Sequence, residues 1–281
     1  MQISNQIGSM IGLGVAGNFA GHLEQAGEAD SFAHVKVKEA IAPKAIFPFY
    51  VHEHAGFLST FPLSGDTITF PNEGDNLQIE PEVALICRIT YKKSEVKNEV
   101  VDLTPLQFAA YNDCSIRNPN ARKISQKKNW GEKTKGVSKT FLDIDKFTEG
   151  GIMDKYRIAC FLHRGADFIE YGIDSPVKGY SYFHAKLLDW IVEKMNSQQD
   201  EDPMENIADH LKTAGYPKYA LISIGATRYT EFGETHFLQK GDRSVVVAYD
   251  GTLYTPDEIT ERVKQNNLNE KGISALCQDI V

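Results

Sequence analysis

The sequence predicts a β-rich α+β protein, because short strand-like segments dominate the chain and do not alternate with helices. The first two are residues 83–91 and 156–162, which are apolar, rich in β-branched and aromatic residues, and bounded by turns. Two more follow at residues 219–224 and 244–249. Helical periodicity is clear in only two segments, so a doubly wound parallel sheet is not expected.

Each of the two predicted helices has its own signal. In residues 182–195, apolar side chains recur every four residues, the spacing of one face of a helix. These side chains are Phe183, Leu187, Ile191 and Met195. In residues 255–265, Thr255 is a candidate N-cap, Pro256 takes the first helical position and Glu258 completes a capping box.

The composition narrows the class of protein. The chain has 281 residues, which suits one large domain or two smaller ones. Its net charge of −8 argues against a protein that grips nucleic acid by the phosphates. No run approaches the roughly 18 apolar residues that span a bilayer, and the apolar start lacks the basic region of a signal peptide. The four cysteines form no C-x-x-C motif and are typical of reduced thiols, so we expect a cytoplasmic protein without nucleic-acid or membrane partners.

A glycine-rich run near the start matches the dinucleotide-binding fingerprint. Gly12, Gly14 and Gly17 have the G-x-G-x-x-G spacing that lets a backbone approach a pyrophosphate. The residues before the run are too polar for a central parallel strand, and Gly21 interrupts any helix that follows. A glycine-rich bend is therefore favoured, and a dinucleotide-binding oxidoreductase is the less favoured alternative.

The strongest local signal is a pair of carboxylates at the mouth of an apolar strand. Glu80 and Glu82 are two residues apart, so in a strand both side chains point from the same face. Carboxylates that converge beside a core repel each other unless a proton, a basic residue or a cation compensates. Mg²⁺ is the natural hard cation for such oxygen ligands. The alternative is a solvated acidic pair at the end of a strand.

A second segment strengthens the case for a cation. Asp113 could supply a third carboxylate, and Arg117 a charged clamp for an anionic substrate. The alternative is a turn with a surface arginine. A third segment, residues 130–136, offers lysines beside glycines that permit a ligand to approach closely.

Taken in order, these motifs resemble those of the fumarylacetoacetate hydrolase family, over roughly residues 12–253. The family's successive motifs have counterparts at residues 17–25, 64–71, 80–82, 112–117, 130–133, 224–227 and 237–242. The resemblance implies a mixed β-sandwich or β-roll of the type of that family's C-terminal domain. It also implies a homodimeric, metal-dependent hydrolase or lyase for a small 2-oxo or 1,3-dicarbonyl carboxylic acid, acting by C–C bond hydrolysis or decarboxylation.

The resemblance assigns roles residue by residue. Three carboxylates would bind Mg²⁺, or Mn²⁺ or Ca²⁺ in its place: Glu80, Glu82 and Asp113. Arg117 and Thr227 would bind the small oxo-acid substrate. The catalytic residues would be His22 as general base, Glu24 beside it, and Lys133 to stabilise negative charge.

A departure from the family pattern leaves alternatives open. The acidic partner of the histidine usually lies three residues further on, where this chain has Gln25. His52 and His54 could replace that pair, or could form an exposed polar turn. A catalytically silent homologue that binds metal and ligand is thus the second interpretation. As to domains, we expect an N-terminal arm or lid over residues 1–45 and a catalytic domain over residues 46–281.

Overall fold

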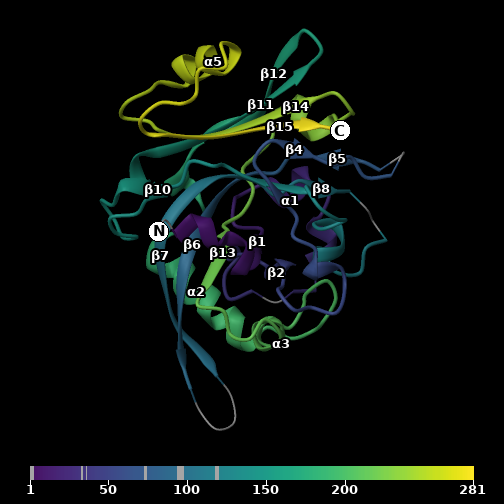
Figure 1. The fold of residues 1–281 in the computed structure, drawn as a ribbon, viewed down its shortest axis with the longest axis vertical. Coiled ribbons are helices and arrows are strands. Elements are labelled where there is room, and N and C mark those ends of the chain that lie inside the picture. Colours follow the sequence, from purple (N-terminus) through teal and green to yellow (C-terminus); the bar gives the residue numbers. More distant parts are fainter. Residues whose placement is uncertain (1–2, 33, 36, 73–74, 94–97, 118–119) are drawn as a thin grey trace.

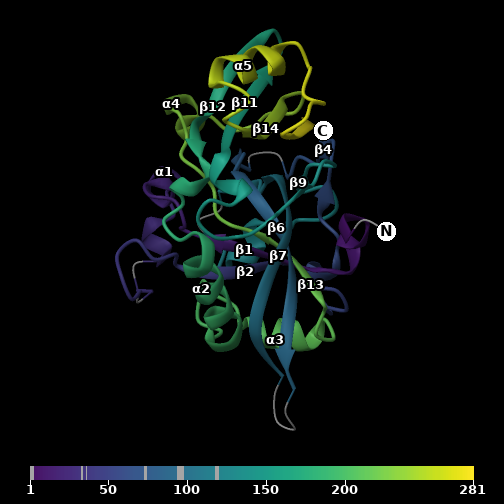
Figure 2. The ribbon, with the colours of Figure 1, turned by 90° about the vertical axis from the view of Figure 1, so that its left-hand side faces the viewer.

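Two large β-sheets pack against each other around one hydrophobic core (Figures 1 and 2). The computed structural model describes residues 3–32, 34–35, 37–72, 75–93, 98–117 and 120–281. Strands of the two sheets are in direct contact, and their apolar side chains face each other between the layers. The mixed sheets and few helices confirm the predicted β-rich α+β fold.

The larger sheet has eight strands and carries the candidate site. Its order is β2 (Ala45–Tyr50), β1 (Ile11–Ala16), β13 (Tyr219–Ser223), β6 (Pro81–Lys92), β7 (Glu99–Asn112), β9 (Lys135–Val137) and β3 (Leu63–Ser64), and β10 (Leu142–Asp143) pairs with β7. The pairs β1–β13 and β3–β9 are parallel, and the other pairs are antiparallel. The long hairpin of β6 and β7 lies in the middle of this sheet.

The smaller sheet has five strands and lies above the first in Figure 1. Its order is β12 (Asp167–Pro176), β11 (Tyr156–Arg164), β14 (Arg243–Asp250), β15 (Ile273–Ile280) and β4 (Thr67–Ile68). A further two-stranded sheet pairs β5 (Leu77–Gln78) with β8 (Ser115–Ile116). This short pair matters for the site, because each of its strands lies next in the chain to one of the acidic segments.

Helices cover the outside of the sheets (Figure 2). The α-helices are α1 (His22–Gln25), α2 (His184–Ser197), α3 (Ile207–Thr213), α4 (Glu231–Thr235) and α5 (Pro256–Lys264). The 3₁₀-helices are η1 (Ile3–Ser9), η2 (Ala29–Phe32), η3 (Phe57–Ser59), η4 (Ile124–Lys127), η5 (Ile152–Lys155) and η6 (Val177–Gly179). Both helices expected from the sequence form as α2 and α5, and the capping box of Thr255 and Glu258 is present. Among the described residues, none of the helices is long and apolar enough to cross a membrane.

The glycine-rich run near the start is a buried strand, not a bend. Residues 11–16 form β1, which lies between β2 and β13 in the large sheet. A side chain at Gly12 would meet the Phe49 ring at 2.2 Å, and one at Gly14 would meet the Phe47 ring at 2.2 Å. The glycines therefore make room for two phenylalanines. Strand β1 pairs with β2 across the expected boundary between residues 45 and 46, and the division into an arm and a catalytic domain stays a prediction.

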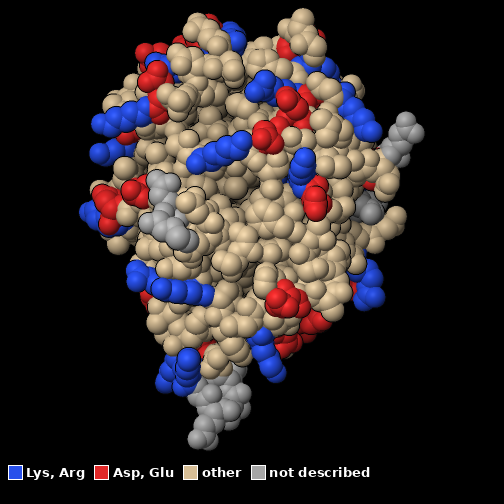
Figure 3. Space-filling view, in the orientation of Figure 1, with Lys and Arg blue, Asp and Glu red and all other residues tan. Residues whose placement is uncertain are grey.

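Charged side chains are distributed differently on the surface and in the interior. On the face shown in Figure 3, acidic and basic side chains are interspersed among uncharged ones. The four cysteines are unpaired, and three of them are buried, as reduced thiols would be. Several ionisable side chains, in contrast, are buried together inside the molecule. They form the candidate site.

Candidate metal and acid–base site

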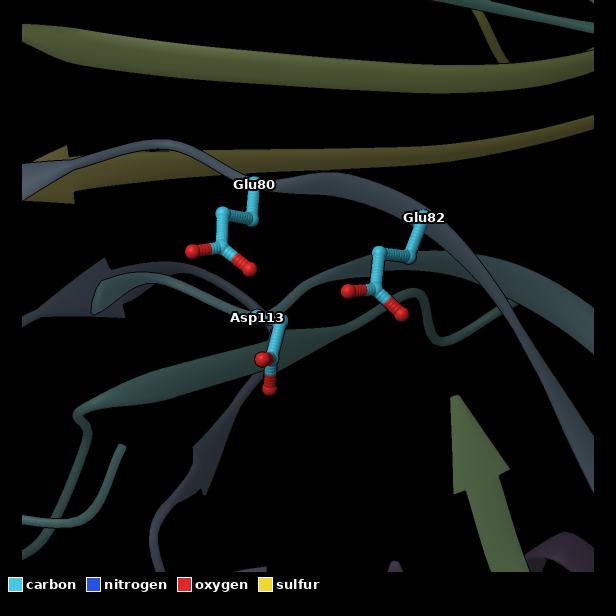
Figure 4. Close-up of side chains that lie close together, drawn as sticks. All are labelled: Glu80, Glu82 and Asp113. Atoms are coloured by element: carbon cyan, nitrogen blue, oxygen red, sulfur yellow. The ribbon is translucent and has the colours of Figure 1, made fainter. Parts of the chain in front are cut away.

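Three carboxylates meet in the large sheet at the point where β6 begins and β7 ends (Figure 4). Glu80 lies just before β6, Glu82 lies within it, and Asp113 follows β7 directly. The β6–β7 ladder brings them together: the Asp113 amide donates to the Glu80 carbonyl oxygen over 3.0 Å. One oxygen of each side chain lies within 4.8 Å of the others, and the exposed fractions are 5%, 2% and 0% in chain order. The three predicted ligands thus converge.

Basic groups face two of these carboxylates. The Lys128 ammonium lies 2.6 Å from Glu80 Oε2 and 2.6 Å from Asp113 Oδ2. The Lys135 ammonium lies 2.5 Å from Asp113 Oδ1. A guanidinium nitrogen of Arg117 lies 2.8 Å from Glu80 Oε1. Each oxygen of Glu80 and Asp113 therefore has a cationic neighbour, whereas the recorded partner of the Glu82 carboxyl is the Gly225 amide, at 3.0 Å.

The donor set nevertheless fits a hard divalent cation. All three side chains offer carboxylate oxygens, the ligands that Mg²⁺ and Ca²⁺ prefer. Asp113 Oδ2 is buried and has no aligned hydrogen bond, although the Lys128 ammonium is close to it. The Lys128 ammonium, shared between Glu80 and Asp113, shows that a cation can stand between them.

The pKa values of the two glutamates are shifted in opposite directions. Burial alone would raise the pKa of Glu80, but the adjacent Lys128 and Arg117 hold that pKa well below its usual range. Burial raises the pKa of Glu82 well above its usual value, and the nearby carboxylates of Asp113 and Glu80 raise it further. Glu82 therefore takes up a proton more readily than Glu80 does.

Arg117 links the cluster to a wider buried network. Beyond Glu80, its guanidinium donates to Gln78 Oε1 at 2.6 Å, Glu28 Oε1 at 2.9 Å and the Tyr229 hydroxyl at 2.9 Å. Four partners therefore fix a side chain that was expected to clamp an anionic substrate. Arg117 forms ion pairs with Glu80 and Glu28 and borders the cavity described below, and its role as a clamp for an anionic substrate stays a prediction.

His22 stands beside the cluster with a defined tautomer. Its Nδ1 lies 2.9 Å from the Thr227 carbonyl oxygen. Because a carbonyl only accepts, Nδ1 carries the proton and Nε2 is left as the basic nitrogen. Burial, partly offset by Glu80 and reinforced by Arg117 and Lys128, lowers the pKa of His22 to about 4. The ring is neutral at physiological pH.

Thr227 positions this histidine rather than facing the cavity. Its carbonyl holds the ring, while its hydroxyl donates to the Pro81 carbonyl oxygen at 3.4 Å. The residue is buried, and Ala226 beside it contributes to the cavity wall. The substrate-binding role expected for Thr227 stays a prediction.

The segment that carries His22 is fastened at Gln25, not at an acid. Gln25 Nε2 donates to the Tyr229 carbonyl at 3.1 Å, and Gln25 Oε1 accepts from the Tyr229 amide at 2.9 Å. Glu24, the expected acidic partner, is exposed to solvent. The nearest buried acid of this segment is Glu28, which pairs with Arg117 and Lys127.

Other predicted residues lie outside the cluster. Lys133 is exposed at a left-handed backbone position, φ 58°, and Lys128 and Lys135 on either side of it are the buried lysines. His52 and His54 follow the far end of β2, since Tyr50 pairs with Gly12 while the cavity lies near Gly17. His54 packs there against His210, so neither histidine replaces the missing acid.

A small cavity joins His22 to two of the three carboxylates, Glu80 and Glu82. Its volume is about 20 Å³, which is close to the space one water molecule or one small ion needs. Its walls come from the ends of β1 and β2, from α1, η2 and η4, and from the acidic segment; His22, Glu80, Glu82, Arg117 and Lys128 are among them. A substrate of several carbon atoms needs a wider opening than this.

Solved structures with the same fold include enzymes. The chain aligns over 98% of its length with 80% of 5-carboxymethyl-2-hydroxymuconate delta-isomerase from Mycobacterium smegmatis, at 12% identity and a TM-score of 0.53. It aligns over 96% with 93% of a fumarylacetoacetate hydrolase family protein from Yersinia pestis, at 11% identity and a TM-score of 0.52. It aligns over its full length with 80% of 2-keto-3-deoxy-D-arabinonate dehydratase in complex with magnesium and 2,5-dioxopentanoate, at 12% identity and a TM-score of 0.52.

The chain therefore has the fold of the fumarylacetoacetate hydrolase-like proteins, as the order of its motifs predicts. At these identities the likeness establishes the fold alone. By sequence, the chain belongs to the family described as "Family of unknown function (DUF5718)", whose model matches residues 28–280. No curated protein matches it.

Proposed function

We propose that this chain is a divalent-metal-dependent enzyme that acts on a small 2-oxo or 1,3-dicarbonyl carboxylic acid, by C–C bond hydrolysis or decarboxylation. The observation that carries the proposal is the convergence of Glu80, Glu82 and Asp113 within 4.8 Å, with His22 on the cavity that Glu80 and Glu82 line. A metal site and a base thus share one enclosed space. Similar folds in an isomerase and in a magnesium-bound dehydratase support a metal-dependent enzyme for a small acid.

Each polar residue then has a task. Glu80, Glu82 and Asp113 would hold Mg²⁺ or Mn²⁺, and Arg117 and Lys135 fix the orientation of Glu80 and Asp113. When bound, such a cation polarises a carbonyl and stabilises enolate charge. His22 Nε2 would take a proton from water or from the substrate, since the Thr227 carbonyl keeps Nδ1 protonated. The enclosed walls exclude bulk water from the reacting atoms.

Turnover is the test of this proposal. Oxaloacetate and a series of acylpyruvates are incubated with the protein and Mg²⁺ or Mn²⁺, and loss of the oxo-acid is followed by absorbance. We expect turnover that EDTA abolishes and that His22→Gln reduces by at least about a hundredfold. Glu24→Gln, a change at an exposed neighbour, should leave the rate unchanged. Metal-independent turnover, or equal rates for the wild type and His22→Gln, would contradict the assignment.

A second candidate is a silent binding protein, and one observation favours it. Gln25 holds the position of the acid that would assist His22, and its amide is committed to the backbone of Tyr229. Such a protein would bind metal and oxo-acid without converting the acid. Binding of an acylpyruvate in calorimetry, with no product after long incubation, would select this candidate.

A further inference from the structure

The buried ionisable groups at the site balance one another. The carboxylates are Glu28, Glu80, Glu82 and Asp113, and the basic side chains are Arg117, Lys127, Lys128 and Lys135. A set of acids matched by an equal number of bases needs no external cation for neutrality. A divalent ion that enters this set has to compete with a basic side chain already present.

Two of the three bases at the cluster are too firmly held to give way. The Lys135 ammonium faces three acceptors, Asp113 Oδ1 and the carbonyls of Asp113 and Cys114, and it is fully buried. The Arg117 guanidinium is divided among Glu80 and three further partners. Moving either would leave several buried groups without partners.

Lys128 is held differently. Its ammonium also has three acceptors, but only one of them is a short hydrogen bond, to Glu80 Oε2 at 2.6 Å. The Asp113 carbonyl lies 3.5 Å away, and the contact with Asp113 Oδ2 lacks hydrogen-bond alignment. The side chain also borders the cavity of about 20 Å³. Two other cavity walls suit a displaced ammonium: the Phe47 ring, whose centroid is 5.3 Å from Lys128 Nζ, and the carboxylate of Glu28.

We infer that the Lys128 ammonium and the divalent cation are alternative occupants of the point between Glu80 and Asp113. Metal binding would expel the ammonium from the carboxylates into the cavity, and metal loss would let it return. This inference rests on the proposed metal site. Two consequences follow: the cluster remains neutralised without metal, and metal binding moves the positive charge of Lys128 into the cavity beside His22.

The test is calorimetric titration of Mn²⁺ into three proteins: the wild type, Lys128→Met and Lys127→Met. Lys127 is the matched control, because it is a buried lysine one position away that pairs with Glu28 and touches none of the three cluster carboxylates. We expect Lys128→Met to bind Mn²⁺ at least tenfold more tightly than the wild type, and Lys127→Met to stay within twofold. If the loss of one positive charge alone strengthened Mn²⁺ binding, both variants would bind Mn²⁺ more tightly to the same extent.

Removal of Lys128 leaves buried carboxylates unpaired, so a second variant guards against misfolding. Lys128→Gln keeps a hydrogen-bond donor and removes the charge. Its melting temperature should fall in EDTA and rise with Mn²⁺ by more than that of the wild type. Equal or weaker Mn²⁺ binding by both Lys128 variants would overturn the competition while leaving the metal site intact. Absence of Mn²⁺ binding in all proteins would instead overturn the metal site itself.

Discussion

Gln25 and Tyr229 are joined by two hydrogen bonds of opposite direction, in which the side-chain amide of Gln25 pairs with the backbone amide and carbonyl of Tyr229. This pair fastens α1 to the loop after β13, and the same loop holds His22 through Thr227. A carboxylate at position 25 could accept from the Tyr229 amide but could not donate to its carbonyl. The residue that departs from the family pattern is thus the one that secures the histidine.

We predict that Gln25→Glu destabilises the protein by about 1–3 kcal/mol. The change removes the donor to the Tyr229 carbonyl and places a second carboxylate beside Glu234, whose Oε2 now accepts from Gln25 Nε2 at 3.1 Å. Urea unfolding at pH 7 measures the effect. Glu24→Gln, at the exposed neighbour, is the control and should change stability by less than about 0.5 kcal/mol. An unchanged unfolding midpoint for Gln25→Glu would mean that the pair does not fasten α1.

We predict that the acid limb of the pH–rate profile lies near pH 4. Burial lowers the pKa of His22 to about 4, so its ring remains neutral and able to accept a proton down to that pH. The same shift contributes to stability above an unfolded value near 6.5, and that contribution is lost as the pH falls from about 6.5 to about 4. The pH dependence of kcat/KM, measured between pH 4 and 8, tests this prediction. An inflection near pH 6.5 would show a solvated histidine instead.

We predict that Glu205 makes the protein less stable as the pH rises from about 4.5 to about 7. Burial raises the pKa of this carboxyl to about 7, and its Oε2 has no hydrogen-bond partner among the residues that the structure describes. The folded state then binds the proton more tightly than the unfolded state, so stability falls as the pH rises through this window, by up to about 3 kcal/mol. Urea unfolding at pH 5 and pH 8 should show the loss in the wild type and a smaller loss in Glu205→Gln. Glu201→Gln, an exposed change nearby, should behave as the wild type.

We predict that Gly12→Ala destabilises the fold by about 1–3 kcal/mol, because the added methyl group would lie 2.2 Å from the Phe49 ring in a closed core. Gly8→Ala is the control, since nothing lies within 4 Å of a side chain there. Thermal unfolding compares the two. In the same assay NAD(H) and NADP(H) should not shift the melting temperature; a shift of several degrees would revive the dinucleotide-binding alternative.

The sequence predicts those parts of the fold and site that depend on local periodicity. The period of two places Glu80 and Glu82 on one face, and α5 begins at its capping box. Other features depend on distant partners. The glycine-rich run is a central strand only because Phe47 and Phe49, more than 30 residues away, fill the space above it. No local pattern contains that information.

The lysines illustrate the same limit. Four lysines lie close together at positions 127, 128, 133 and 135. The sequence around them does not indicate which lysine contacts the carboxylates. The turn of η4 directs Lys128 to the carboxylates, and the pairing of β9 with β7 places Lys135 beside Asp113. Lys133, which the motif order selects, lies on the exposed turn between them.

The metal site is tested most directly by titrating Mn²⁺ into the wild type and into Glu82→Gln by calorimetry. Glu82 is the suitable position, because the amide of glutamine keeps an acceptor for the Gly225 N–H and removes the carboxylate that would bind the metal. We predict one bound ion per chain in the wild type, and affinity at least a hundredfold weaker in Glu82→Gln at unchanged melting temperature in EDTA. Equal binding by the two proteins would contradict the assignment of Glu80, Glu82 and Asp113 as the metal ligands.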